Sequence, residues 1–382
     1  MLRRIVASWQ DAGHRVEVLS SQPSYKVGVD NERRPAHDSV DGVPVDRMAL
    51  PNEASRPLIR VVNALRLGTK LLWKAFTRKY DVIMISTAPP VLGGAAAALA
   101  SKLTGARFIY HCMDIHPEVG KVSGEFANPL VFSVLSKLDQ WACRQAAPVV
   151  VLSQDMANTL RERPDGKKLS LRVLNNFSLP AERPMPNELP FDWPTEAFTV
   201  LFAGNVGRFQ GLDTVVEAMG ELRHRDDIAF VMMGEGVAKS ALQERAVELG
   251  ARIQFVGHQP VEVAKAAMQR ADAGFVSLTA DIYRYAYPSK TMTYLEQGCP
   301  LIVAVEPESE LASEVITGGY GYAIPPGDST ALVELLKKLA EDGDATSLMK
   351  GGAKEKARQD FSEEVVLAEW GNLLQQEERG KA

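Results

Sequence analysis

The sequence of 382 residues has few cysteines, no long apolar run and no strong excess of charge. Its three cysteines, Cys112, Cys143 and Cys299, are widely spaced and form no CxxC pair, which argues against a disulfide framework and a structural zinc site. The net charge of -5 lacks the basic excess that is typical of nucleic-acid-binding proteins. No apolar window of about 18 residues and no signal-peptide pattern occurs. We therefore expect a cytoplasmic protein with no membrane-spanning segment, no nucleic-acid partner and no secretion by that route.

The composition that is present, 46% hydrophobic and 24% charged residues, is that of ordinary globular proteins, and the length suits two domains. Residues 178–194 contain five prolines, which interrupt regular structure. We predict an N-terminal domain over 1–177, a linker over 178–196, a C-terminal domain over 197–360, and a closing helix and tail over 361–382.

Short β-rich runs alternate with helical segments in both halves of the chain, which predicts an α/β protein with a parallel sheet in each domain. The expected strands lie at 14–21, 43–50, 81–87, 106–113 and 148–153 in the first half, and at 198–205, 228–236, 252–258, 273–278 and 299–305 in the second.

An opening strand is missing from this pattern, because residues 2–11 have helical spacing and lead directly into the strand expected at 14–21. In doubly wound sheets the first strand usually lies in the middle, so its absence leaves neighbouring strands with unpaired backbone groups. We hypothesise that the natural polypeptide begins upstream of Met1, which intact-mass analysis of protein from the native source would test. The alternative is a variant sheet that begins with the strand at 14–21.

Glycines follow three consecutive expected strands of the second half. The segment 204–211, GNVGRFQG, joins a strand to a helical run, and glycines there let backbone amides approach a phosphate. Gly234, Gly236 and Gly257 end the next two strands, at the sheet edge where ligands bind. This pattern predicts a diphosphate pocket, although each glycine alone is also an ordinary turn residue. Val256 could flank a nucleobase or simply pack in its strand.

The segment 283–300 contains the strongest local signal. Pro288 and Ser289 open a helix, and Lys290 lies in its first turn. A cation is disfavoured at a helix N-terminus by the dipole, so a lysine there indicates that an anion compensates it. We predict that Lys290 holds a diphosphate; the alternative is a solvated surface lysine.

The order of these motifs, GNxGxxQGLD, MGEG, FVGHQP, YPSKxxxYxxxGCP and GYGYAIPPGD, resembles the group 1, family 4 retaining glycosyltransferases over nearly the whole chain. VEVLSSQPSY near 16–25, DIHPE at 114–118 and LNNF at 174–177 resemble the branch that transfers amino or deoxy hexoses in surface-polysaccharide assembly, such as lipopolysaccharide or capsule. The resemblance implies a GT-B fold, with two Rossmann-like domains whose parallel sheets face a central cleft. It also implies a UDP- or other NDP-sugar donor bound by the C-terminal domain, and neither an obligatory metal nor another cofactor.

Carried over to this chain, the resemblance implies a donor-binding set made of Gly204, Asn205, Gly207, Arg208, Gln210, Gly234, Gly236, Val256, Ser289, Lys290 and Thr293. Four features depart from the family: Gln210 replaces a lysine, an arginine near Asn205 is absent, Thr293 replaces a glutamate that binds the donor ribose, and Tyr285 replaces another glutamate. We expect Arg208 and Lys290 to supply the positive charge that a leaving diphosphate needs.

Asp114 and His116 are the catalytic candidates, because they follow an expected strand of the first half and would line the cleft. Asp114 would orient the sugar or the acceptor in a reaction that has oxocarbenium-like charge. The neighbouring Glu118 is better explained as a cap of the following turn.

Residues 56–79 contain seven basic residues and no acid. Four of them recur every four residues and form a basic stripe, opposite an apolar set: the stripe is Arg66, Lys70, Lys74 and Arg78, and the set is Leu58, Val62, Leu65, Leu72 and Phe76. The stripe predicts a helix on an anionic bilayer surface, which would suit a peripheral membrane protein with a lipid-linked acceptor. An ordinary amphipathic helix packed on its own sheet is the alternative.

Together these patterns predict a glycosyltransferase that moves a hexosyl or N-acetylhexosaminyl group from a UDP-sugar to a glycan or lipid-linked acceptor. The alternative is a catalytically silent GT-B subunit that binds a nucleotide or a partner, which the changes at Gln210 and Thr293 would permit.

Overall fold

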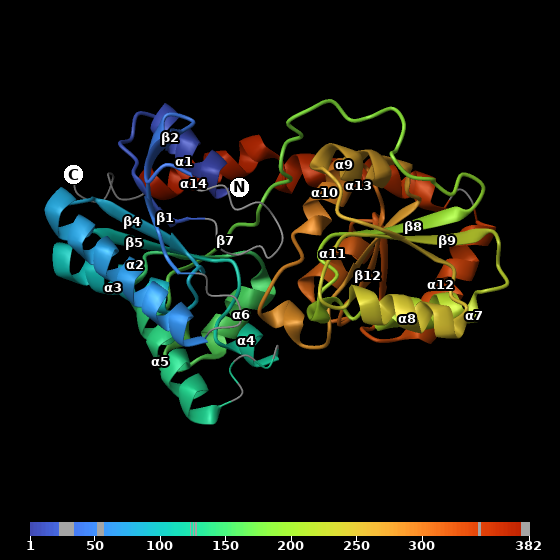
Figure 1. The fold of residues 1–382 in the computed structure, drawn as a ribbon, viewed down its shortest axis with the longest axis horizontal. Coiled ribbons are helices and arrows are strands. Elements are labelled where there is room, and N and C mark those ends of the chain that lie inside the picture. Colours follow the sequence, from blue (N-terminus) through green and yellow to red (C-terminus); the bar gives the residue numbers. More distant parts are fainter. Residues whose placement is uncertain are drawn as a thin grey trace. The chain divides into compact units, whose positions relative to one another are not determined.

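The computed structural model describes residues 1–22, 34–51, 57–122, 124, 126, 128–342 and 345–375 (Figure 1). The chain divides into two compact units. Unit 1 comprises Met1–Leu174 together with Leu367–Ala382, and unit 2 comprises Asn175–Val366. No helix in the described part of the chain is long and apolar enough to cross a bilayer.

The described strands of unit 1 form two sheets. The first has the order β1-β3-β2, with β1 (Val18–Ser21) parallel and β2 (His37–Val40) antiparallel to β3 (Val43–Met48). The second is parallel throughout, in the order β4 (Val82–Ser86), β5 (Arg107–Cys112), β6 (Val149–Val151) and β7 (Leu171–Val173). Among the described residues no strand joins β1 to β4, so the two sheets are separate.

Helix α5 of unit 1 begins at a side-chain cap that the sequence provides. Asn128 caps α5 by accepting hydrogen bonds from the N–H groups of Leu130 and Val131, and Pro129 occupies the first helical position, where no N–H is needed. The described helices of this part of the chain are α1 (Leu2–Asp11), α2 (Pro57–Arg78), α3 (Leu92–Thr104), α4 (Glu118–Val122), α5 (Pro129–Gln145), α6 (Gln154–Glu162) and the short η1 (Gly166–Lys168).

The last described helix, α14 (Glu363–Gln375), runs from unit 2 into unit 1. Its Trp370 is fully buried, with the ring 6.1 Å from that of Trp9 and 4.8 Å from that of His111. The indole N–H of Trp9 donates to the Trp370 carbonyl at 3.2 Å. The part of α14 around Trp370 therefore belongs to the core of unit 1.

Unit 2 contains a described parallel sheet in the order β10-β9-β8-β11-β12-β13. Its strands are β8 (Phe198–Ala203), β9 (Ile228–Met233), β10 (Ile253–Val256), β11 (Ala273–Ser277), β12 (Leu301–Ala304) and β13 (Gly321–Ile324). The order reverses between β8 and β11, which is the switch point of a doubly wound sheet.

Apolar side chains of this sheet pack against the surrounding helices; Val200, Phe202, Phe230 and Phe275 are fully or almost fully buried in that core. The helices are α7 (Asp213–Glu221), α8 (Lys239–Leu249), α9 (Val261–Arg270), α10 (Lys290–Glu296), α11 (Glu310–Thr317), α12 (Ser329–Glu341) and α13 (Ala345–Asp360), with the short η2 (Arg208–Gln210) and η3 (Ile282–Arg284).

The α/β class is confirmed, and each of the ten expected strands contains a strand of the structure. Strands β2, β7 and β13 were not predicted. The expected strands of unit 1 pair in parallel, whereas the additional β2 pairs antiparallel to β3. The two strands are joined by the tight Asp41-Gly42 turn, in which both residues have positive φ (52° and 79°), as a two-residue hairpin requires.

Candidate functional site

The loops that follow β8, β9 and β10 hold one another at the carboxyl edge of the unit 2 sheet. The N–H of Gly204 donates to the Met233 carbonyl at 3.0 Å, and the N–H of Gly234 donates to the Val256 carbonyl at 2.9 Å. These bonds continue the ladder beyond the strands and fix the backbone beside the switch point. Ligands of doubly wound sheets bind at this edge.

Glycine is required in these loops because the backbones approach very closely. Gly204 and Gly234 have φ of 148° and 145°, which side chains rarely allow. A Cβ at Gly234 would lie 1.8 Å from the Gly204 carbonyl oxygen, and one at Gly236 would lie 2.1 Å from the Val206 carbonyl oxygen. The glycines predicted for phosphate contact are therefore also needed for the packing of one loop on the next.

Gly234→Ala should lower the free energy of unfolding by more than about 2 kcal/mol, because the added methyl group meets backbone rather than a movable side chain. Gly351→Ala is the matched control, since this glycine lies within α13 with nothing within 4 Å of the added Cβ. The control should be neutral or more stable by up to about 1 kcal/mol. Denaturant unfolding followed by circular dichroism compares the two, and equal effects would contradict the role of the close approach.

Lys290 lies against the first of these loops. Its Nζ is 3.5 Å from the centroid of the Phe202 ring, and a Cβ at Gly204 would lie 3.4 Å from the same atom. The Nζ is buried and has no hydrogen-bond partner among the described residues. Burial lowers the pKa of Lys290 to about 7. The face of an aromatic ring compensates an ammonium only weakly, so this arrangement favours the binding of an anion beside Gly204.

Tyr294 holds Lys290 in this place. Its side chain is fully buried, and its hydroxyl donates to the Leu201 carbonyl at 2.8 Å and accepts from the Ala203 N–H at 2.7 Å. One turn of α10 separates Tyr294 from Lys290. The helix that carries the lysine is thereby attached to the end of β8.

The remaining predicted residues of the loop 204–211 differ in their availability. Asn205 and Arg208 are exposed, so both can reach a ligand at this edge. Gly207 is buried, and its N–H donates to Oε1 of Gln210 at 3.0 Å. Gln210, which stands where the family has a lysine, therefore closes the loop with its own side chain.

Thr293, Ser289 and Val256 complete the predicted donor-binding set. Thr293 is half-buried, with Oγ1 at 3.4 Å from the Ser178 hydroxyl oxygen. Ser289 is exposed at the start of α10, whereas the side chain of Val256 is buried in β10. A contact of Val256 with a nucleobase would therefore run through its backbone.

Glu296 lies one turn after Thr293 and has other partners. Its Oε2 accepts a hydrogen bond from the Ser178 hydroxyl at 2.7 Å and lies 2.7 Å from Nζ of the buried Lys265. This carboxylate joins Ser178 to α9 and α10 and is engaged by these partners rather than left for a ligand.

The catalytic candidates Asp114 and His116 lie together on the loop between β5 and α4 in unit 1. Burial raises the pKa of the Asp114 carboxyl, which has no hydrogen bond or ion pair in the described part of the chain. The carbonyl of His116 accepts a hydrogen bond from Nη2 of Arg163 at 3.0 Å. The loop thus presents a carboxyl group that remains available for a ligand.

Sequence reasoning missed a buried ionic network beneath this loop. Arg163 makes a two-point ion pair with Glu118, at 3.0 Å from Nε to Oε1 and 2.6 Å from Nη2 to Oε2. Its Nη1 contacts Oδ2 of the buried Asp139 at 2.7 Å, and Asp139 also accepts from the Tyr110 hydroxyl at 2.9 Å. Glu118 therefore has a structural role, as expected, but through an ion pair rather than a cap. The only sequence signal was Asp139 itself, the one acid within α5.

His111 is a core residue rather than a catalytic one. It is fully buried on β5 against Trp370, and burial lowers its pKa to about 4. The imidazole is therefore neutral at physiological pH.

Comparison with known proteins agrees with this architecture. Residues 1–176 match the model of the glycosyl transferase 4-like domain, and residues 197–342 match that of glycosyl transferases group 1. The chain is 26% identical over 321 residues to the probable glycosyltransferase WbjE of Pseudomonas aeruginosa, covering 82% of this chain and 78% of WbjE. It is 24% identical over 307 residues to the putative colanic acid biosynthesis glycosyl transferase WcaI of Escherichia coli strain K12, covering 76% and 72%.

Among solved structures, Alr3699/HepE of Anabaena in complex with UDP and glucose matches with a TM-score of 0.69 and 18% identity, covering 98% of this chain and 94% of HepE. That likeness shows the fold, two Rossmann-like domains of the GT-B type. With a 4-like domain followed by a group 1 domain, the chain belongs to the group 1 glycosyltransferases of GT-B fold.

Proposed function

We propose that the chain transfers a hexosyl or N-acetylhexosaminyl group from a UDP-sugar to a glycan or lipid-linked acceptor, with retention of configuration. The observation that carries the donor assignment is the buried Lys290 ammonium beside Gly204, at the carboxyl edge of the unit 2 sheet. UDP and glucose in the HepE complex, and colanic acid biosynthesis in the name of WcaI, support the donor and the polysaccharide product.

In the proposed reaction, negative charge develops on the diphosphate as it leaves. Lys290, the exposed Arg208 and the backbone amides of the loop 204–211 stabilise that charge. As the bond from the sugar to the diphosphate breaks, a phosphate oxygen accepts the proton of the attacking hydroxyl. The new bond then forms on the same face of the sugar, which retains the configuration. Asp114, whose pKa is raised by burial, orients the acceptor or the sugar.

We propose that this charge arrangement makes an obligatory metal unnecessary. Transfer should then continue in excess chelator, and a loss of activity that added divalent metal restores would overturn this part. We also propose that the reaction takes place in the cytoplasm; the three cysteines are free, buried thiols, which suits a reducing compartment.

Thermal-shift measurements with UDP, GDP, dTDP and their sugars test the donor site. One nucleotide should raise the unfolding temperature of the wild-type protein, because a ligand that binds the native state stabilises it. Lys290→Ala should remove this response. Lys337→Ala is the control, since Lys337 lies on α12 in a surface ion pair with Glu334.

Hydrolysis of the UDP-sugar then separates an active enzyme from a silent subunit. Release of UDP by the wild-type protein that is lost in Lys290→Ala supports transfer. A folded protein that binds a nucleotide without releasing product, or that binds none, would contradict the proposed activity.

A further inference from the structure

Helix α2 turns its apolar side chains toward solvent. The exposed fraction is 81% for Leu58, 58% for Leu65, 63% for Trp73 and 52% for Phe76. These residues recur at helical spacing and share one side of α2. Together with the exposed Val61 and Val62 they form the outer face of α2. The alternative, in which this apolar set packs on the sheet of unit 1, does not hold for these residues.

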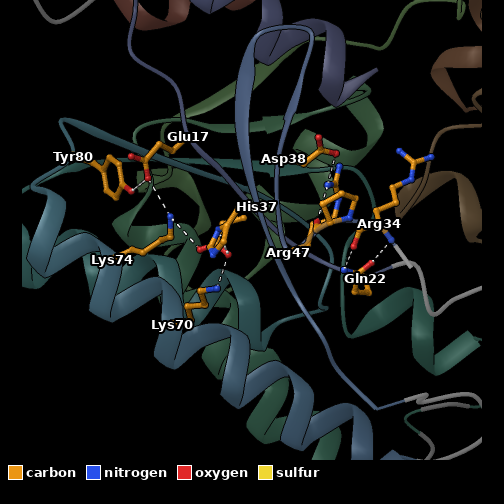
Figure 2. A network of polar contacts seen from close by, with 11 residues as sticks. Glu17, Gln22, Arg34, His37, Asp38, Arg47, Lys70, Lys74 and Tyr80 are labelled. Atoms are coloured by element: carbon orange, nitrogen blue, oxygen red, sulfur yellow. Dashed lines mark hydrogen bonds and ion pairs between the residues drawn. The ribbon is translucent and has the colours of Figure 1, made fainter. Parts of the chain in front are cut away.

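Two lysines of the basic stripe turn inward instead. Nζ of Lys70 lies 2.6 Å from Oδ1 of Asp46, and Nζ of Lys74 lies 3.3 Å from Oδ2 of the same residue and 3.1 Å from Oε2 of Glu17 (Figure 2). The Glu17 carboxylate also accepts a hydrogen bond from Tyr80 at 2.6 Å. These ion pairs set the rotation of α2, and they correct the prediction that Lys70 and Lys74 face a membrane. Arg56, the first residue of the predicted segment, lies outside the described residues.

Two neighbouring helices continue the apolar surface. α2 packs on α3, where Gly68 faces Ala96, and α3 packs on α5 (Figure 1). The exposed apolar residues on these two helices are Leu99, Leu103, Leu130, Val131 and Val134. With the outer face of α2 they make up what we call the three-helix surface. Exposed apolar side chains on helices that pack against one another are a candidate contact surface for a protein or a membrane.

The charge on these helices is of one sign. α2 and α3 contain no acidic residue, and Asp139, the only acid of α5, is buried against Arg163. The exposed basic residues on or next to the three helices include Arg66, Lys79, Lys102 and Lys137. This basic region occurs in a chain whose net charge is -5.

We propose that the three-helix surface docks on an anionic lipid bilayer. Exposed apolar side chains among basic ones are the pattern of an interfacial helix, in which the apolar side enters the headgroup boundary and the cations meet lipid phosphates. Trp73 suits that boundary because its ring is apolar and its N–H is polar. Lipid phosphates supply the negative charge that these three helices lack.

A second copy of the chain fits this surface less well. A symmetric dimer buries the same patch on both partners, so the basic residues of one copy would face a patch whose exposed charges are also basic. Like charges would then face each other without acids to neutralise them. The inference goes beyond transfer itself and does not depend on the donor site.

Co-sedimentation of the full chain with vesicles tests the proposal. The protein should bind vesicles of phosphatidylcholine mixed with phosphatidylglycerol, and bind pure phosphatidylcholine much more weakly. The double variant of Leu65→Ser and Trp73→Ser should lower vesicle affinity by about tenfold or more, because each change removes a large apolar side chain from the lipid contact. The matched control changes Val247 and Leu348 to serine, since these residues of unit 2 are 83% and 85% exposed and lie outside the surface.

Charge-reversal variants and a measurement of the oligomeric state complete the test. Arg66→Glu with Lys102→Glu should weaken binding to the anionic vesicles only, and added salt should act in the same direction. All variants should keep the wild-type unfolding temperature and any thermal response to nucleotide, so a loss of vesicle binding cannot be ascribed to misfolding or to the donor site. Absence of vesicle binding, or equal losses in the control variant, would overturn the proposal. A concentration-dependent dimer that Trp73→Ser dissociates, without vesicle binding, would assign the surface to a second copy instead.

Discussion

Raising the pH above about 7 should weaken the binding of a UDP-sugar by up to about tenfold per pH unit, because Lys290 holds the diphosphate only when it is protonated. Burial lowers the pKa of Lys290 from its usual 10.5 to about 7 in the protein without ligand. A diphosphate beside the ammonium favours the charged form and raises that pKa again. Binding therefore takes up a proton. Titration calorimetry with a UDP-sugar, in buffers of different ionisation enthalpy, measures both the affinity and the uptake.

The same residue should make the protein without ligand more stable as the pH rises. The folded-state pKa lies below the unfolded value, so the unfolded chain binds more protons between about pH 7 and 10.5. Across that window the contribution of Lys290 to the free energy of unfolding rises by up to about 1.4 kcal/mol per pH unit. Lys290→Met should remove this rise and, at neutral pH, be more stable than the wild type while it loses nucleotide binding.

Lys337→Met is the control for the affinity and the stability measurements, because this surface lysine lies on α12 and is ion-paired with Glu334. It should leave the pH dependence of affinity and stability unchanged. An affinity that does not vary with pH, or a Lys290→Met variant that is less stable than the wild type, would contradict the assignment of Lys290 as a destabilised anion-binding group.

Arg163→Met should lower the free energy of unfolding by about 3–5 kcal/mol. The change leaves the carboxylates of Glu118 and Asp139 without their shared cation in a buried place, and an unpaired buried charge is costly. Denaturant unfolding at neutral pH measures the loss. Arg144→Met is the matched control: its ion pair with Asp165 is exposed on both sides, so the cost should stay below about 1 kcal/mol.

A second variant keeps this prediction testable if Arg163→Met does not fold. Arg163→Lys retains the positive charge but loses the guanidinium group. A lysine cannot reproduce the two hydrogen bonds to Glu118 together with the one to the His116 carbonyl. It should fold, with a smaller loss of stability, and lower kcat more than it raises the KM for the donor. Equal unfolding energies for Arg163→Met and Arg144→Met would show that the network does not support the loop.

Most of the unit 2 sheet could be predicted from sequence. Its strands are runs of β-branched and apolar residues such as 228–233, and β8, β9 and β10 are each followed directly by a glycine. In a parallel α/β unit this spacing leaves few other arrangements. β13 (Gly321–Ile324) was not predicted because it has only four residues, of which the middle two are half-buried. It therefore lacks the alternation of apolar and polar residues that predicts a strand. β7 (Leu171–Val173) is shorter still.

The candidate site was only partly predictable. Lys290 stood out because a cation in the first turn of a helix opposes the dipole, and the structure adds its burial on Phe202. Sequence did not show that Gln210 bonds to Gly207 within its own loop, because that bond depends on the backbone conformation of the turn. It could not show that Glu296 joins Ser178 to Lys265, since these partners lie on other segments. Arg163 and Asp139 meet only after α5 and the end of α6 are packed beneath the loop after β5.

Helix α2 shows most clearly which properties follow from the local sequence and which depend on tertiary packing. The sequence of 57–78 was enough to establish a helix with basic and apolar sides, because that depends only on the residues within it. Which side faces inward depends on what stands opposite. Asp46 on β3 and Glu17 just before β1 bind Lys70 and Lys74. Ala64 and Ala75 are buried, whereas Leu58, Trp73 and Phe76 are exposed. Which side of α2 is covered is decided only in three dimensions, because an ion pair or an apolar contact needs a partner from a segment outside the helix.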